Sequence, residues 1–306
     1  MKLLITGARG FLGFTMAEVA QRRGWEICGI GRSAQAPDGW PGRYCWADVA
    51  QSDLTPILNG FGPDIVFHGA GSASVGQSFN TPIDDLRGSV LAFAGLLDAV
   101  RRSSSRPTVI FPSSAAVYGN PIRLPVSEED AVSPISPYGF HKLQCEILAR
   151  EYAECFGLRV LVGRLFSLFG MRQKRLLVWE LLQQFISDEP IVRIQGTGEE
   201  TRDFLWADDA MNMMLDITAS QFQSGAESAM EVFNIASGIE TSVMRMTVVL
   251  QSLLGCKKEI ETGESTRIGD PTRWCADTTK AKMALPRFSW TLLEDGLQKL
   301  IVNCSP

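Results

Sequence analysis

The stretch "KLLITGARGFLG", Lys2–Gly13, joins a short apolar run to three closely spaced glycines. The apolar run predicts a buried strand that stops at Gly7, and a helical pattern follows over about residues 11–23. In this strand–turn–helix order, the first glycines let the backbone turn tightly and let a pyrophosphate approach, and Gly13 permits close packing of helix on strand. The helix N-terminus offers free N–H groups to an anion. The stretch therefore predicts a turn that binds the phosphates of a dinucleotide.

Strand and helix alternate through the rest of the first half of the chain. Further apolar runs predict strands at residues 25–31, 43–49, 64–70, 107–114 and 158–166, and helical patterns cover about residues 81–102 and 137–156. Continuous apolar strands separated by helices are typical of a parallel sheet with helices on both faces. We therefore expect an α/β fold built on a Rossmann-type doubly wound parallel sheet.

The pattern changes near residue 170, where helices, short strands and loops become mixed. We expect residues 1–169 to form a dinucleotide-binding Rossmann domain, to which some later segments return. Residues 170–306 are expected to form mainly a smaller C-terminal cap of mixed α/β structure. The cap would bind the substrate, because ligands of open α/β sheets bind outside the carboxyl ends of the strands.

The composition is that of a soluble globular protein. The 306 residues are 45% apolar and 21% charged, with a formal net charge of −5. No basic run is present, which argues against a nucleic acid or a membrane surface as a partner. No apolar run approaches the ~20 residues that span a bilayer. Seven scattered cysteines without C-x-x-C spacing predict reduced thiols and a cytoplasmic protein. Because His68 and His141 are far apart in sequence, no metal site is expected.

A second stretch, "SPYGFHKLQCE" (Ser136–Glu146), places Tyr138 four residues before Lys142 on a predicted helix. This spacing alone also occurs on ordinary surface helices. However, "FPSSAAVYG" puts Ser113 and Ser114 at the carboxyl end of a strand, on the ligand side of the sheet. A phenol has a pKa of about 10, and a nearby ammonium lowers it. Tyr138 could then exchange a proton with a substrate oxygen during hydride transfer, while Ser114 hydrogen-bonds that oxygen and Lys142 holds the nicotinamide ribose.

The residues after the second strand bear on the choice of dinucleotide. NAD-binding units usually place an acid there, whereas this chain has Arg32 and Ser33, and Arg9 lies inside the glycine turn. Two guanidiniums suit a 2′-phosphate, so NADP is favoured, with NAD as the alternative if Arg32 stacks on adenine and Arg9 points to water. Asp48 could accept from the adenine amine or lie in water. The residues expected to contact the cofactor are Gly7, Arg9, Gly10, Phe11, Leu12, Gly13, Arg32, Asp48, Val49, Ala70, Tyr138 and Lys142.

Three motifs together resemble one family. "TGARGFLG" resembles the T-G-x-x-G-x-x-G turn, "SSAAVYG" the catalytic-serine segment, and "YGFHK" the Tyr-x-x-x-Lys of the extended short-chain dehydrogenase/reductase family, in its nucleotide-sugar epimerase/dehydratase branch. The resemblance runs along nearly the whole chain. It implies an enzyme with Ser114, Tyr138 and Lys142 as catalytic residues and a nucleoside-diphosphate sugar as substrate.

The resemblance also implies substrate-binding residues in the cap. "GTGEETRDFLWADD" is similar to a loop whose arginine contacts the substrate diphosphate, which corresponds to Arg202. "RIGD" resembles a segment whose arginine meets the phosphate and whose acid meets the ribose, here Arg267 and Asp270. Surface ion pairs are the alternative role for both arginines. Ser89 and Ser167 occupy positions where the family often has an amide, so the sugar pocket is expected to differ in detail.

The resemblance leaves three reactions of the family to distinguish. Dehydratases place an Asp-Glu pair beside the catalytic serine or threonine, and this chain has Ala115 and Ala116 there, which argues against dehydration. Arg9 and Arg32 favour NADPH-dependent reduction of a nucleoside-diphosphate 4-keto-(6-deoxy)hexose. The alternative enzyme is a nucleoside-diphosphate-sugar 4-epimerase with retained NAD. A non-enzymatic, redox-sensing Rossmann regulator is the alternative from another class, and a proton-transfer tyrosine argues against it.

The resemblance further implies a homodimer. The helical segments at about residues 81–102 and 137–156 are similar to those that pair two subunits of the family through a four-helix bundle. Their apolar positions Val90, Phe93, Leu97 and Ile147 could instead all belong to the core of a monomer.

Overall fold

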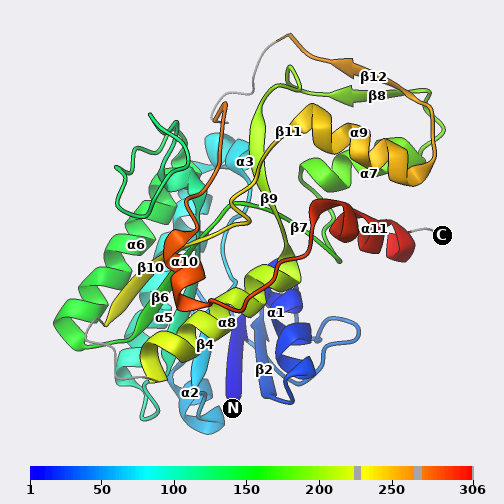
Figure 1. Ribbon diagram of the computed structural model, residues 1–306. Helices are drawn as coiled ribbons and strands as arrows, with labels where there is room; N and C mark the ends of the chain where they lie inside the picture. The colour runs from blue at the N-terminus through cyan, green and yellow to red at the C-terminus, as the bar shows by residue number, and fades with distance from the viewer. Residues whose placement is uncertain (224–228, 265–270, 305–306) are drawn as a thin grey trace.

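A parallel sheet of seven strands forms the centre of the molecule, which confirms the predicted Rossmann-type α/β fold (Figure 1). The computed structural model describes residues 1–223, 229–264 and 271–304. In spatial order, the strands are β10 (Met230–Ile235), β6 (Val160–Leu165), β5 (Thr108–Ser114), β4 (Ile65–His68), β1 (Lys2–Thr6), β2 (Glu26–Gly31) and β3 (Arg43–Trp46).

The strand order reverses between β1 and β4. From β1 the chain moves outward to β2 and β3, and then returns to β4 and moves the other way through β5 and β6. At such a reversal the flanking connections leave on opposite faces of the sheet, so a crevice opens at the carboxyl ends of the strands. The topology therefore places the ligand site at the ends of β1 and β4.

The central strands are apolar because both of their faces are covered. Every residue of β4 and β6 is buried. The seventh strand, β10, pairs with β6 and was not among the predicted strands. Glu231 and Asn234 interrupt its apolar run, so the strand is recognised only from its pairing with β6.

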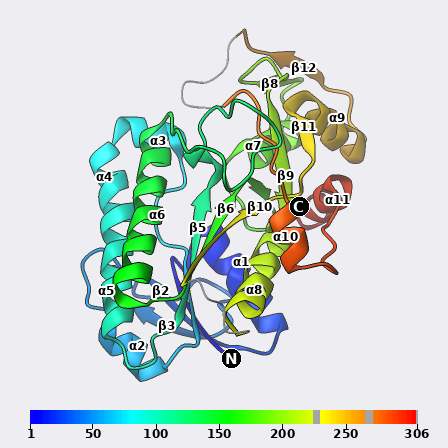
Figure 2. The same ribbon diagram turned by 60° about the vertical axis from the view of Figure 1, so that its left-hand side comes forward.

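Helices cover both faces of the sheet (Figure 2). On one face α1 (Phe11–Arg22), α8 (Ala207–Gln223) and α10 (Thr279–Ala284) pack in a core cluster that includes Leu3 and Ile5 of β1. On the other face α2 (Thr55–Phe61), α5 (Ala92–Arg102) and α6 (Pro137–Phe156) pack in a cluster that includes Leu4. Neighbouring residues of one strand thus pack in core clusters on opposite faces of the sheet, because side chains alternate between the two faces along a strand.

The predicted helix near residues 81–102 is interrupted. It consists of α4 (Pro82–Leu86), a π-helical turn at Arg87–Leu91 and α5, and the short α3 (Val75–Asn80) precedes it. A π-turn is a local feature that often accompanies functional sites. Here it buries Ser89, whose Oγ accepts from Ser72 N at 3.3 Å.

The later elements form a smaller body with its own core cluster. A three-stranded sheet contains β11 (Glu240–Ser242), β9 (Thr201–Trp206) and β7 (Ser167–Phe169), and a two-stranded sheet pairs β12 (Glu259–Thr262) with β8 (Ile191–Ile194). The helices of this body are α7 (Leu177–Ile186), α9 (Val243–Leu254) and α11 (Leu293–Cys304), seen at the upper right in Figure 1. None of the helices in the described part of the chain is long and apolar enough to cross a membrane.

Candidate active site

The glycine turn after β1 is closely packed. Gly7 has φ +70°, and a Cβ there would lie 2.4 Å from Gly69 O. A Cβ on Gly13 would lie 2.3 Å from Gly7 O, so α1 approaches the strand at a distance that only glycine allows. No acidic residue lies in the first turn of α1, whose free N–H groups therefore remain suited to an anion.

A cavity of about 760 Å³ opens above this turn. Its walls come from the carboxyl ends of β1, β2, β3 and β4, the place where the strand order reverses. The size lies within the range of cofactor sites, and the turn leaves room for a pyrophosphate against the backbone. The residues present therefore fit a dinucleotide.

Most of the predicted cofactor residues lie around this cavity. Gly7, Arg9, Gly10, Arg32, Asp48, Val49 and Ala70 line it. Phe11, Leu12 and Gly13 are the first residues of α1, next to the lining. The Asp48 carboxylate accepts from Ala50 N at 3.0 Å, which fixes the loop after β3 at the cavity wall.

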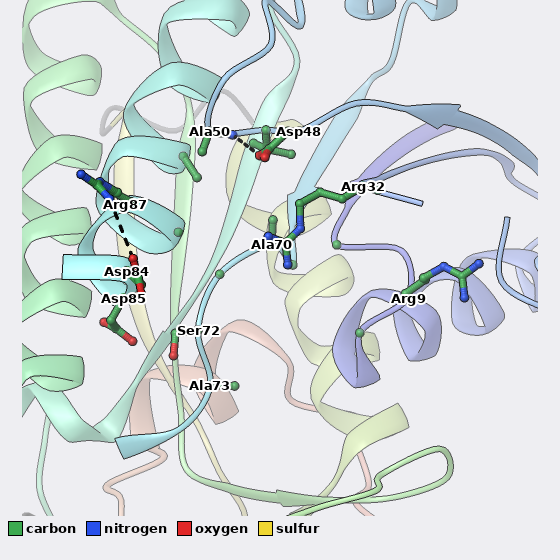
Figure 3. Close-up of a pocket in the computed structure, with 18 of the residues that line it drawn as sticks. Arg9, Arg32, Asp48, Ala50, Ala70, Ser72, Ala73, Asp84, Asp85 and Arg87 are labelled. Carbon is green, nitrogen blue, oxygen red and sulfur yellow. Dashed lines mark hydrogen bonds and ion pairs between the residues drawn. The ribbon is translucent and has the colours of Figure 1, made fainter. Parts of the chain in front are cut away.

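The two arginines near this cavity are placed differently. Figure 3 shows Arg32 extending into the cavity toward Ala70, whereas Arg9 extends the other way. Arg9 Nη2 donates to Ser33 Oγ at 3.1 Å and to Gln35 O at 2.9 Å. Within the described residues the Arg32 side chain makes no hydrogen bond or ion pair. Only Arg32 therefore presents an uncommitted guanidinium to a ligand at this end of the cavity.

The three predicted catalytic residues come from two neighbouring elements. Ser114 ends β5, and its Oγ accepts from Ala116 N at 3.1 Å, so its hydroxyl proton remains available for donation. Tyr138 is the second residue of α6, where Ser136 caps the helix by accepting from Gly139 N at 3.2 Å. One turn later, the buried Lys142 Nζ lies 5.7 Å from the centre of the Tyr138 ring and donates to Pro112 O at 2.8 Å.

A neutral histidine lies beneath this group. Burial, with a smaller contribution from the Lys142 charge, lowers the pKa of His68 to about 3. His68 Nδ1 and Thr6 Oγ1 are 3.0 Å apart, and Thr6 Oγ1 also accepts from Ala70 N at 3.2 Å. His68 thus connects the ends of β1 and β4 without adding a charge beside Lys142.

A second cavity, of about 460 Å³, lies between the sheet and the later elements. Ser114, Tyr138, Ser167 and Arg202 line it, so it brings two predicted catalytic residues together with two predicted substrate residues. Arg202 donates from Nη1 to Thr201 O at 2.8 Å, and its guanidinium carbon lies 5.5 Å from the centre of the Trp274 ring.

The remaining predicted substrate residues are not in this cavity. Ser89 is buried in the π-turn and lines neither of the two cavities. Arg267 and Asp270 lie outside the described residues. The structure adds residues that sequence reasoning missed: Gln173, Arg175, Gln184, Arg193 and Trp274 all line the second cavity. They are on cap segments whose sequences carry no motif, so only the fold identifies them.

Comparison with known proteins shows the family of the chain. A model of the "NAD dependent epimerase/dehydratase family" matches residues 3–236. The chain belongs to the NAD-dependent epimerase/dehydratase family.

Individual proteins of this type match along the whole length of the chain. A UDP-glucose 4-epimerase of Mycolicibacterium smegmatis is 28% identical, covering 98% of this chain and 97% of the relative. MoeE5 in complex with UDP-glucose and NAD is 30% identical with a TM-score of 0.86, covering 99% and 98% of the two chains. A UDP-glucose 4-epimerase of Thermotoga maritima, solved with UDP-glucose, is 25% identical with a TM-score of 0.88, covering 99% and 98%.

In this member of the NAD-dependent epimerase/dehydratase family, a buried polar network holds α6, the helix that carries Tyr138 and Lys142. Glu146, one turn after Lys142, accepts from Ser113 Oγ at 2.5 Å and from Arg164 Nη2 at 2.8 Å. Arg164 Nη1 donates to Tyr118 OH at 2.9 Å, and that hydroxyl donates to Asn234 at 2.7 Å. The network joins α6, β5, β6 and β10 directly behind Ser114. Two features of the sequence could have indicated this network. Glu146 follows Lys142 by four residues, and Arg164 lies inside the otherwise apolar run of β6.

Proposed function

We propose that the chain is a nucleoside-diphosphate-hexose 4-epimerase that retains NAD. The observation that carries this proposal is that Ser114 and Tyr138 line the second cavity together with Arg202, and that this cavity shares Ala73 and Arg175 with the lining of the dinucleotide cavity. A sugar held there would have C4 beside the proton-transfer groups and next to the nicotinamide end of the first cavity. The relatives described as UDP-glucose 4-epimerases support this reaction and support uridine as the base.

The groups of the chain account for the chemistry at C4. NAD, when bound, supplies the hydride acceptor and donor. Tyr138 would take the proton of the C4 hydroxyl as the carbonyl forms and return it when the hydroxyl is restored. The Lys142 ammonium, 5.7 Å from the centre of the Tyr138 ring, would offset part of the negative charge that passes through the tyrosine oxygen in this step. Ser114 would donate its free hydroxyl proton to the same oxygen, which stabilises the charge that develops there.

Epimerisation also requires the 4-ketosugar to present both faces to the same hydride. We infer that the nucleotide stays fixed while the sugar turns. Arg202, Arg267 and Asp270 are the residues proposed to hold the diphosphate and ribose, because binding energy distant from the reacting carbon can position it. The lining of the second cavity includes Phe166, Leu168 and Leu176, whose apolar side chains would impose few fixed contacts on a turning sugar.

One observation supports a second candidate, an NADPH-dependent 4-keto-(6-deoxy)hexose reductase. Arg32 extends into the dinucleotide cavity without a partner in the described residues, and an unpaired guanidinium suits a 2′-phosphate. In contrast, Arg9 is already held by Ser33 and Gln35. The sequence suggested two arginines for a 2′-phosphate, but among the described residues only Arg32 is unpaired. The structural support for NADP is therefore weaker than the sequence indicated.

The experiment that tests the proposal is incubation of the purified protein with UDP-glucose and no added cofactor, with products followed by NMR. We expect an equilibrium mixture of the two C4 epimers, and NAD in the solution released by denaturation. Tyr138→Phe should keep the cofactor and lose about 10²–10⁴-fold in turnover, the usual cost of a lost proton-transfer group. Stoichiometric NADPH consumption with a 4-keto sugar would identify the reductase instead. Absence of turnover with every nucleotide sugar would favour a regulator.

A further inference from the structure

The short helices α3 and α4 contribute to the walls of both cavities. Val75 and Gly76 of α3 line the second cavity, whereas Gln77 of α3 and Asp85 of α4 line the dinucleotide cavity. Figure 3 shows Asp85 on the opposite side of that cavity from Arg9. The two helices therefore adjoin the places of both proposed ligands, and the proposed mechanism gives them no role.

Helix α3 bonds the first turn of α6, the helix that carries Tyr138 and Lys142. The backbone N–H of Tyr138 donates to Ser78 Oγ at 3.1 Å, and Ser78 Oγ donates to Val75 O at 2.6 Å. An N–H in the first turn has no acceptor within its own helix, and Ser78 supplies one. Because Ser78 is fully buried and lines neither cavity, its bond acts on the position of Tyr138 rather than on a ligand.

Helix α4 makes a second contact, with His141 one turn further along α6. Nδ1 of His141 pairs with Oδ2 of Asp85, and the two side chains are 9% and 2% exposed. The other carboxylate oxygen, Oδ1, has no partner among the described residues, so His141 is the donor on which this buried carboxylate depends. A buried carboxylate without a donor is costly, which favours keeping α4 against α6.

We propose that α3 and α4 position Tyr138 for proton transfer, through Ser78 and through the Asp85–His141 pair. The two bonds reach α6 at its second and fifth residues, so together they restrain the place and the direction of its first turn. Because the same two helices adjoin both cavities, they set the phenol relative to both ligands. This inference rests on the proposed function, because it requires Tyr138 to exchange a proton with a ligand in the second cavity.

Two serine variants test the inference. Ser78→Ala removes the acceptor of the Tyr138 N–H. Ser103→Ala is the matched control, because Ser103 is also buried, donates to Val100 O at 2.8 Å and accepts from Arg106 N at 3.3 Å. Ser103 lies at the far end of α5 and lines neither cavity. Each variant loses one donated and one accepted hydrogen bond, so a similar loss of stability in denaturant is expected for both.

The kcat with UDP-glucose should fall by about tenfold to a hundredfold in Ser78→Ala, since a small displacement of a reacting group costs about that much. The KM and the NAD retained per chain should stay as in wild type, and Ser103→Ala should keep the wild-type kcat. His141→Leu should lower kcat in the same way without raising KM. In His141→Asn the side-chain amide can still donate to Asp85, so most of the kcat should be recovered.

Three outcomes would overturn the inference: an unchanged kcat in Ser78→Ala, an equal loss of kcat in Ser103→Ala, or a rise in KM that accounts for the whole loss of activity. Equal kcat values in His141→Leu and His141→Asn would remove the Asp85–His141 pair from it. If the wild type instead consumes NADPH with a 4-keto sugar, the proposed epimerase is refuted, and the same variants compared in that reaction decide the inference. A wild type without turnover on any nucleotide sugar would refute the proton transfer on which both proposals rest.

Discussion

Arg32 and Arg9 differ in what they can offer to a dinucleotide, although both lie near its predicted ribose. The loop that follows β2 already accepts hydrogen bonds from Arg9, whereas Arg32 extends into the cavity unpaired among the described residues. A 2′-phosphate adds about −1.5 to −2 charge near neutral pH, by analogy with other phosphomonoesters. We therefore expect any discrimination between NADP and NAD to depend mainly on the Arg32 side chain.

We predict that Arg32→Ala weakens NADPH by about one to two decades and changes NADH little. The lost interaction is a charge-assisted hydrogen bond, worth about 1.5–3 kcal/mol. Both affinities should be measured in wild type and variant at one salt concentration, because exposed charge pairs are screened. Arg9→Ala is the control and should have the smaller effect on NADPH. If Arg32→Ala weakens both dinucleotides equally, Arg32 stacks on adenine, and the reductase loses its structural support.

His68 predicts how the protein responds to acid. Its pKa is lowered to about 3 in the folded chain, against an ordinary value of 6.5. Below about pH 6.5 the unfolded chain binds a proton that the folded chain refuses, so stability falls as the pH falls toward 3. The slope from this group is about 1.4 kcal/mol per pH unit. Denaturant unfolding between about pH 7 and pH 5 should show a shallower loss for His68→Gln. Equal slopes in both proteins would refute this role.

At the scale of elements, α6, the helix that carries Tyr138 and Lys142, is held to the sheet by a buried charge pair. Glu146 of α6 and Arg164 of β6 are both buried, and Ser113 of β5 bonds the same carboxylate. Desolvation makes such a pair a weak source of net stability, but removal of one partner leaves a buried charge and costs about 3–5 kcal/mol. We expect the pair to matter more for the positions of Ser114 and Lys142 than for stability. Ser113 directly precedes Ser114, and Glu146 follows Lys142 by one turn.

We predict different responses of stability and turnover when this pair is removed. Arg164→Met alone should destabilise the protein by about 3–5 kcal/mol. Glu146→Leu combined with Arg164→Met should recover most of that stability, because no unpaired charge remains. The kcat of the double variant should remain below that of the wild type by up to about a hundredfold. Ser113 has lost its acceptor in this variant, so the proposed catalytic groups are no longer aligned. Denaturant unfolding and kcat are measured on the same samples, and full turnover in the double variant would make the pair purely structural.

The elements differ in whether the sequence alone could predict them. The glycine turn and the Tyr138–Lys142 helix were predicted because short local patterns specify them, and the sheet was predicted because buried strands read as apolar runs. The strand β10 and the π-turn at Arg87–Leu91 depend on neighbours distant in sequence. Arg175 carries no motif, and its place between two cavities arises only when the cap folds over the sheet. The division of the chain near residue 170 remains a prediction.

At the scale of the whole molecule, one face of the helical layer exposes apolar side chains. Ile83 of α4 and Leu91, the last residue of the π-turn, are 59% and 51% exposed, and Phe140 and Ile147 of α6 are 51% and 58% exposed. Phe93 and Leu97 are fully buried in the core, so they do not contribute to this face. Contiguous exposed apolar groups often mark an interface between subunits.

We predict that two copies of the chain pair through this face, with α4, α5 and α6 of each subunit forming a bundle. Light scattering at micromolar concentration should give twice the chain mass of 33.6 kDa. Ile147→Arg should produce monomers, because a charge placed in a desolvated interface is costly. Met283→Arg, which changes a 77% exposed apolar residue of α10, is the matched control and should remain a dimer. A wild-type protein found only at 33.6 kDa would refute the dimer, and dissociation by both variants would show that net charge rather than this face controls assembly.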